Sequence, residues 1–272
     1  MDIQQQSQLK ILVIGDSCED IYHYGECIRI SQEAPVPVLR HFKSETYGGM
    51  ARNVYENLVA LGNNVDIITN SEKITKERFV DTRTMHHLLR FDTGESSKIS
   101  SANSKIIDET DFSLYSSIVI SDYCKGFLDE DSIVKILSYC EDFNLPVFVD
   151  TKRKDMSCYN NCIIKVNQFE YEGISRHPVN SEIIVTSGKS GASWNGKEFP
   201  AHKSQIDSLT ISISDAIRGT NVCGAGDTFL SGLVTEYLIS KDMRKSIEFA
   251  NMCASKAVEK FGTYVVSMDD VR

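Results

Sequence analysis

Short apolar runs that each end in polar residues constrain the fold of this chain more than any other feature. The runs are rich in β-branched residues without polar alternation, a pattern typical of strands buried on both faces of a sheet. Apolar residues recur at helical spacing between several runs, notably over residues 50–61 and 132–143. The six runs are Ile11–Ile14, Val65–Ile68, Ile118–Ile120, Val147–Val149, Ile163–Val166 (interrupted by Lys165) and Ile183–Val185. The alternation predicts an α/β fold, a mostly parallel open sheet covered by helices on both faces.

Polar residues come directly after each of these runs. In open parallel sheets, ligands bind beyond the carboxyl ends of the strands, so these side chains should gather at one edge. They are Gly15-Asp16, Thr69-Asn70, Ser121-Asp122, Asp150-Thr151-Lys152, Asn167 and Thr186. Their joint position predicts a binding site at that edge.

A glycine-rich segment precedes the helical pattern that begins near residue 228. Its sequence is Asn221-Val222-Cys223-Gly224-Ala225-Gly226-Asp227. Glycines permit turns in which consecutive N–H groups point at one spot, and a helix N-terminus favours an anion there. Asp227 then falls in the first helical turn. From spacing alone it has two interpretations of similar weight: it caps the helix, or it accepts a proton from an attacking hydroxyl.

Length and composition limit the classes of protein to consider. The 272 residues fit one domain over 1–272, and the net charge of −9 argues against a general nucleic-acid binder or an anionic-membrane protein. Residues 1–10 are polar, without a signal peptide, and no apolar run would span a bilayer. The eight cysteines lack paired CxxC spacing, so we expect free thiols in a cytoplasmic protein and no zinc site.

Two β ribbons are predicted outside the main sheet pattern. Apolar residues nearly alternate with polar ones over residues 21–47, where Pro35 and Pro37 interrupt them. Proline inside a strand pattern indicates an edge or a projecting ribbon, so we expect a small β flap or lid at about 21–47. A shorter hairpin is predicted around Asn195-Gly196, a frequent two-residue turn.

The segment from Asn221 to Phe229, followed by Ser231-Gly232-Leu233, resembles the C-terminal signature of the ribokinase-like (PfkB-type) carbohydrate kinases. The resemblance implies that Asp227 is the catalytic base. It also implies that the backbone amides of Gly224, Ala225 and Gly226 bind the transferred phosphoryl group. The chain departs from the usual signature at Asn221, where Asp is more usual, and at Cys223, where Thr or Ser is usual.

Three further stretches resemble one subgroup, the heptose 7-phosphate kinases of ADP-heptose synthesis. They are residues 29–38 (RISQEAPVPV), residues 121–126 (SDYCKG) and Asp150-Thr151-Lys152. The subgroup usually has proline in place of both Gln32 and Thr151. In bifunctional relatives a nucleotidyltransferase domain follows the kinase, so we expect no second activity in a chain ending at Arg272.

The resemblance also implies residues for the acceptor sugar. Gly48, Gly49 and Asn53 are similar to the family's substrate motif, with Asp16 as the companion carboxylate. Region 71–92 is shorter than in the family. Either of two arginines in it would suit a substrate phosphate, although surface positions are the commoner fate of such residues. These candidates are Arg83 and Arg90, with Lys125 in the loop after a buried strand.

Nucleotide and metal residues are implied in the same way. Asn167 and Glu170 are similar to an Asn-x-x-Glu motif that holds hydrated Mg²⁺ against the nucleotide phosphates, although this spacing is also a plain helix-capping pattern. Thr186 and Gly188 fall beside the nucleotide, and Asn251 matches a position near the adenine. Gly188-Lys189-Ser190 is not a P-loop, because Ile183 stands where that motif needs its first glycine.

These patterns predict an ATP- and Mg²⁺-dependent kinase that phosphorylates C1 of a heptose 7-phosphate. Two alternatives stay open: a kinase of another sugar or nucleoside, of the ribose, fructose or adenosine type, and a catalytically weak sugar-phosphate-binding or scaffold protein. A flap with exposed edges also predicts a homodimer formed by β pairing.

Overall fold

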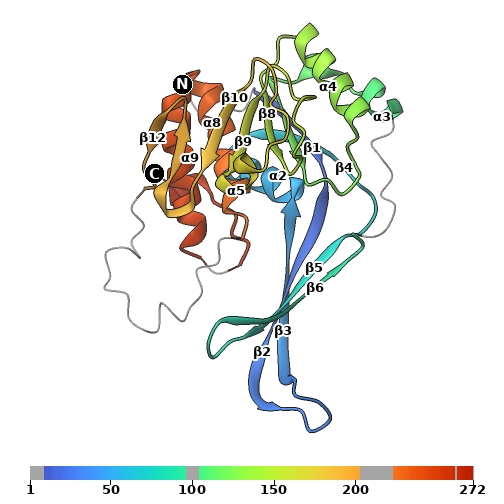
Figure 1. The fold of residues 1–272 in the computed structure, drawn as a ribbon, viewed down its shortest axis with the longest axis vertical. Helices are drawn as coiled ribbons and strands as arrows, with labels where there is room; N and C mark the ends of the chain where they lie inside the picture. Colours follow the sequence, from blue (N-terminus) through green and yellow to red (C-terminus); the bar gives the residue numbers. More distant parts are fainter. Residues whose placement is uncertain (1–8, 96–103, 203–222, 261, 272) are drawn as a thin grey trace.

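The computed structural model describes residues 9–95, 104–202, 223–260 and 262–271, whose strands form two sheets (Figure 1). The larger sheet has eight strands in the order β12-β11-β10-β9-β8-β7-β1-β4. Their bounds are β1 Lys10–Gly15, β4 Asn64–Thr69, β7 Ser117–Asp122, β8 Val147–Thr151, β9 Ile163–Asn167, β10 Glu182–Thr186, β11 Ala192–Trp194 and β12 Lys197–Phe199.

The strand directions confirm the predicted mostly parallel sheet. Each of the six predicted runs lies in one of its strands, and all neighbours from β10 to β4 are parallel. Only β11 and β12 run antiparallel, as an edge hairpin. Asn195 and Gly196 make its turn with φ angles of 50° and 72°, which suit the twist of a two-residue hairpin.

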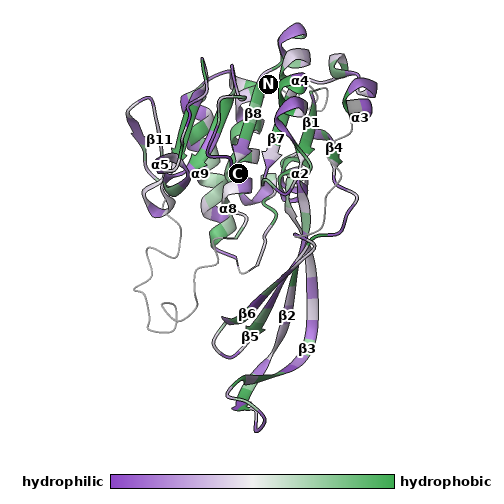
Figure 2. Ribbon diagram, turned by 45° about the vertical axis from the view of Figure 1, so that its right-hand side comes forward, coloured by the Kyte–Doolittle hydropathy of each residue, from purple (hydrophilic) through white to green (hydrophobic). Residues whose placement is uncertain are grey.

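Helices cover both faces of this sheet. Helix α4 (Glu130–Asp142) packs on one face, and α2 (Ala51–Ala60), α8 (Ala225–Ser240) and α9 (Met243–Val258) pack on the other (Figure 1). Successive residues of one strand enter opposite cores: Leu12 joins the cluster under α4, and Val13 joins the cluster under α2 and α8. Burial on both faces explains why these strands do not alternate in polarity, and they are largely green in Figure 2.

The remaining helical segments are short. They are α3 Ser104–Glu109, α5 Gln168–Glu172, and the 3₁₀ turns η1 Phe112–Leu114, η2 Gly188–Ser190 and η3 Met268–Asp270. Within the described ranges, none of the helices has the length and apolar character needed to cross a bilayer.

The second sheet is the projecting part of the molecule, and we call it the flap (Figure 1). Its four strands lie in the order β3-β2-β5-β6, with bounds β2 Ser17–Ile30, β3 Pro37–Met50, β5 Thr75–Asp81 and β6 His86–Thr93. The range predicted for the ribbon, 21–47, lies within β2, β3 and their connection. Strands β5 and β6 were not predicted, because they contain few apolar residues and no clear strand pattern. β5 is held as a strand by pairing with β2, which is distant in sequence.

The flap is continuous with the core at both ends of its long hairpin. Strand β2 starts two residues after β1 ends, and β3 ends at Met50, directly before α2. At this junction Cys18 pairs with Gly49 and Glu19 pairs with Gly48. The base of the flap therefore lies at the carboxyl edge of the central sheet.

Candidate active site

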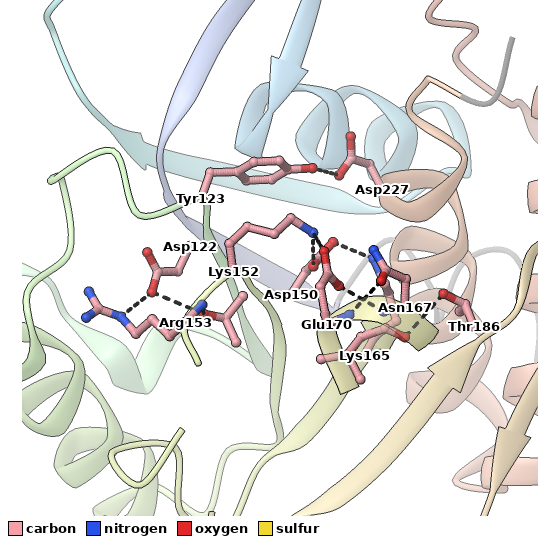
Figure 3. A network of polar contacts seen from close by, with 12 residues as sticks. Asp122, Tyr123, Asp150, Lys152, Arg153, Lys165, Asn167, Glu170, Thr186 and Asp227 are labelled. Atoms are coloured by element: carbon pink, nitrogen blue, oxygen red, sulfur yellow. Dashed lines mark hydrogen bonds and ion pairs between the residues drawn. The ribbon is translucent and has the colours of Figure 1, made fainter. Parts of the chain in front are cut away.

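Asp227 is the centre of the polar groups at this edge. It lies in the first turn of α8 and is 5% exposed. Its Oδ2 accepts a hydrogen bond of 2.8 Å from Asn53 Nδ2 on α2. Its Oδ1 accepts one of 2.9 Å from the hydroxyl of Tyr123, after β7 (Figure 3). Three segments far apart in sequence thus hold one buried carboxylate.

The surroundings of Asp227 raise its pKa from 3.8 to about 6. Burial is the largest cause, and the negative charge of Asp150 adds to it. The hydrogen bond from Asn53, the charge of Lys165 and the hydrogen bond from Tyr123 act in the opposite direction. A carboxylate with this pKa is ionised near neutral pH yet basic enough to accept a proton, which suits a general base.

The turn before Asp227 has the backbone expected for an anion site. Gly224 adopts a left-handed conformation with φ 79°, and a Cβ added there would lie 2.7 Å from Asn53 Nδ2. The Thr228 N–H bonds to the Gly224 carbonyl and begins the helical pattern. The N–H groups of Ala225 and Gly226 precede that bond, so the helix itself offers them no acceptor. Asn221 lies outside the described residues.

A chain of alternating charges runs from Gly226 away from the helix. Asp150 lies at its centre and pairs with Lys165 at 2.5 Å and with Lys152 at 3.2 Å. Lys152 also pairs with Glu170 at 2.6 Å. The two lysines and Asp150 lower the cost of burying one another. Burial alone would raise the pKa of Asp150, but the charges of Lys165 and Lys152 outweigh this effect and hold that pKa below its usual value.

On the flap side, a second buried ion pair faces the site. Asp20 on β2 and Arg78 on β5 form a salt bridge of 2.6 Å, and their side chains are 7% and 6% exposed. Arg78 Nη2 also lies 3.2 Å from Cys223 Sγ. A Cβ on Gly49 would lie 2.6 Å from Asp20 Oδ2, so glycine there lets the backbone approach this carboxylate.

Several predicted acceptor residues have other partners in the structure. The carboxylate of Asp16 is fully buried and accepts backbone N–H bonds of 3.1 Å from Lys125 and Phe127, so it holds the loop after β7. The Lys125 ammonium pairs with Glu95 at 2.8 Å. Among the described residues of the predicted set, Gly49 lies against Asp20 and Asn53 bonds to Asp227, whereas Gly48, one position earlier on β3, lies against Arg52 and Glu56.

The two predicted arginines lie on the exposed part of the flap. Arg83 is in the turn after β5 and pairs with Asp81 at 3.2 Å, and Arg90 pairs with Asp92 at 2.6 Å. Their side chains are 48% and 51% exposed. Among the described residues, the arginine buried beside the glycine-rich turn is instead Arg78.

Sequence reasoning gave no individual role to five residues of the site: Asp20, Arg78, Tyr123, Asp150 and Lys165. Lys165 left a visible signal as a cation inside an apolar run. Tyr123 and Asp150 belong to stretches already singled out, but nothing in the order of residues showed which side chains turn inward.

The Asn167–Glu170 pair forms a capping box at the start of α5. Asn167 Oδ1 accepts from the Glu170 N–H, and Glu170 Oε2 accepts from the Asn167 N–H, both at 2.8 Å. The described residues contain no group of three His, Cys, Asp or Glu side chains placed to hold a metal ion. Glu170 Oε1 already pairs with Lys152, so direct coordination does not fit, whereas accepting a hydrogen bond from a metal-bound water does.

The remaining predicted nucleotide residues follow β9 along the same edge. The hydroxyl of Thr186 donates to the Val166 carbonyl at 3.2 Å, and Gly188 begins η2 with φ 53°. Asn251 on α9 donates to the carbonyls of Phe199 and Pro200 at 3.1 and 3.3 Å. Asn251 also lines a cavity of about 770 Å³ with residues 197–202, Arg244 and Glu248.

Comparison with known proteins places this site in a family. Residues 67–270 match the model of the pfkB family carbohydrate kinases. The chain belongs to this family. Asp227 and the glycine-rich turn lie inside the matched range, so the predicted resemblance is confirmed and the protein is a carbohydrate kinase.

Solved structures share the fold of this pfkB kinase. A ribokinase from Thermotoga maritima has a TM-score of 0.67 at 14% identity, covering 97% of this chain and 98% of its own. Phosphofructokinase-2 from Escherichia coli has a TM-score of 0.69 at 14% identity, covering 97% of each chain. At this identity the likeness shows a ribokinase-like fold.

Curated relatives are similar over the full length of the chain. The bifunctional protein HldE of Sulfurimonas denitrificans is 27% identical and covers 100% of this chain, and that of Hyphomonas neptunium is 28% identical and covers 97%. The matches take up 65% and 63% of those relatives, so the chain spans just under two thirds of their length.

Proposed function

We propose that this kinase transfers the γ-phosphoryl group of ATP to the C1 hydroxyl of a heptose 7-phosphate. The main support for an active site is Asp227, a buried carboxylate at the start of α8 that accepts hydrogen bonds from Asn53 and Tyr123. The stretches that resemble heptose kinases, and the similarity to bifunctional HldE proteins, support the choice of acceptor.

The reaction follows from the groups at the start of α8. The acceptor hydroxyl oxygen attacks the γ-phosphorus, its proton passes to the Asp227 carboxylate, and the bond to the bridging oxygen breaks so that ADP leaves with the electron pair. The N–H groups of Ala225 and Gly226 stabilise the charge on the transferred oxygens. The pKa of Asp227, about 6, suits this transient protonation.

The acceptor binds between the base of the flap and α2. Asp20, already paired with Arg78, presents a carboxylate beside Gly49, and carboxylates accept hydrogen bonds from sugar hydroxyls. Lys76, 5.6 Å from the centre of the Tyr123 ring, and Arg90, opposite Arg78 in the β5–β6 pair, supply positive charge for the sugar phosphate. Arg83 is placed too far out along the flap to be the first choice.

Mg²⁺ belongs to the proposal as a partner of the nucleotide phosphates. When bound, it neutralises phosphate charge. Glu170, with Asn167 fixing its orientation through the capping box, would contact it through water. The cavity beside Asn251 is the proposed place of the adenine.

We also propose a homodimer through the flap and a cytoplasmic location. Large apolar side chains of the flap are 50–63% exposed, far more than a monomer needs to leave in water: Ile28, Ile30, Val36, Phe42, Leu89 and Phe91. All eight cysteines lie in the described residues as free thiols, which suits a reducing compartment.

An acceptor panel tests the function. ADP release is measured with ATP and purified heptose 7-phosphate, ribose, fructose, fructose 6-phosphate and adenosine. Preferential turnover of heptose 7-phosphate supports the proposal, and preference for another acceptor reassigns the substrate. Binding of heptose 7-phosphate without turnover of any acceptor would instead support the scaffold alternative.

A further inference from the structure

Lys165 is a cation inside a strand that is otherwise buried. Its side chain on β9 is 4% exposed, and Asp150, which lies opposite it in the β8–β9 register, is its ion-pair partner at 2.5 Å. Burying two ions costs several kcal/mol each, which their attraction offsets only with good geometry and further hydrogen bonds. A structural role alone is a poor explanation for so costly a pair.

The ammonium of Lys165 has unused hydrogen-bonding capacity. An ammonium carries three donors, and across the described ranges Asp150 is the one acceptor that Lys165 reaches. Lys152 differs, because it divides its charge between Asp150 and Glu170. Two donors of a nearly buried ammonium therefore have no acceptor among the described residues and could serve a bound ligand.

These donors lie against the turn that opens α8. A Cβ added to Gly226 would lie 2.9 Å from Lys165 Nζ, so the ammonium touches the glycine of the proposed phosphoryl site. Any larger residue at 226 would push the lysine away. The cation and the free N–H groups of the helix start thus meet at one place.

We propose that Lys165 is a further catalytic residue, whose ammonium donates hydrogen bonds to the oxygens of the transferred phosphoryl group while Asp150 holds it in position. This inference rests on the proposed function. Lys165 keeps its proton throughout: the hydroxyl proton still passes to Asp227, and the bond to the bridging oxygen still breaks toward ADP. The ammonium adds positive charge where the transition state gathers negative charge.

Three variants of the full chain test the proposal. Lys165→Met removes the cation, and Asp150→Asn removes its partner. The double variant removes one positive and one negative charge together. It keeps the test open if Lys165→Met, which leaves the buried Asp150 with Lys152 as its remaining ion-pair partner, fails to fold. Lys135→Met is the matched control, because Lys135 on α4 pairs with Asp108 on α3, away from the site.

The readouts are kcat, nucleotide affinity by calorimetry and the pH profile of kcat/KM. We expect Lys165→Met and the double variant to lose about 10²–10³-fold in kcat. Their affinity for ATP should fall about tenfold or more, while that for ADP, which lacks the γ-phosphoryl group, hardly changes. Lys165 lowers and Asp150 raises the pKa of Asp227, so Lys165→Met should move the acidic limb upward and Asp150→Asn should move it downward.

The outcomes separate this inference from the proposed function. Wild-type protein that binds neither nucleotide and turns over no acceptor would overturn both. The role of Lys165 alone would be overturned if wild type turns over its acceptor normally while the double variant keeps a near-normal kcat and an unchanged ratio of ATP to ADP affinity.

Discussion

Replacing Asp227 with Asn tests the catalytic base and its electrostatic environment together. Asn keeps the size of the side chain: its oxygen still accepts from Asn53, and its amide can donate to the Tyr123 oxygen. The proton acceptor is lost, so kcat should fall about 10²–10⁴-fold. Because both hydrogen bonds can still form, the variant should keep its local structure while its turnover falls.

The same substitution should stabilise the fold at neutral pH. The pKa of Asp227 is raised from 3.8 to about 6, so the folded state binds the proton more tightly than the unfolded state. Its ionisation therefore destabilises the protein by about 3 kcal/mol above pH 6, and this penalty disappears below the unfolded value of 3.8. Asn carries no such penalty.

Urea unfolding at pH 7.5 and pH 4, with ADP release as the activity assay, checks both effects. We expect the variant to be more stable than wild type by up to about 3 kcal/mol at pH 7.5, with a smaller difference at pH 4. Asp242→Asn is the matched control, because Asp242 caps α9 by accepting the N–H groups of Arg244 and Lys245 and lies in no proposed active-site contact. Retained turnover would refute the base assignment, and a pH-independent stability difference would refute the electrostatic reasoning.

Four further predictions concern the acceptor, the pH profile, the metal and the dimer. Removing the phosphate from the acceptor should cost at least about 10²-fold in kcat/KM, because Lys76 and Arg90 lose the phosphate charge that they bind; equal turnover of free sugars, measured by ADP release, would contradict the heptose phosphate assignment. The kcat/KM of wild type should rise with pH through about 6, as Asp227 loses its proton, and a profile flat from pH 5 to 8 would count against it. Glu170→Gln keeps the capping box but should raise the Mg²⁺ concentration for half-maximal rate about tenfold. Glu172→Gln removes a charge from the same helix, can still accept from Gln168 and should leave the titration unchanged; an unchanged titration in Glu170→Gln would leave Glu170 as a cap. Phe42→Ser combined with Ile30→Ser should convert the dimer into a monomer in sedimentation experiments, and wild type that sediments as a monomer would end the dimer proposal.

The central sheet was predictable because its signal is local. Each strand buried on both faces appears as one apolar run, and the glycines before Asp227 mark the start of α8 within a few residues. The second sheet was not, because β5 becomes a strand by pairing with β2, more than fifty residues earlier in the chain. Arg83 and Arg90 were chosen because the family that the chain resembles has arginines near these positions, and the sequence did not show that Arg78 is the arginine whose side chain faces the core.

The site was predictable in its centre and not in its connections. Asp227 and Asn53 carried strong motifs, but their contact joins helices whose packing no spacing reveals. The capping and metal interpretations of Glu170 use the same two residues, so sequence alone had no means of separating them. Lys165 was visible as an interruption, yet its partner Asp150 is defined only by the register of two parallel strands.

The place of β1 in the sheet governs how this protein folds. β1 is the first strand in the chain, yet it lies between β4 and β7, and a parallel neighbour requires a crossover before it can pair. One side of β1 can pair with β4, but its other side stays unpaired until the ribosome has released β7, well over a third of the way along the chain. Such non-local pairing gives a high contact order, so folding should be slow and dependent on late-synthesised segments. The nascent chain passes through a stage in which its most apolar strand needs protection from aggregation.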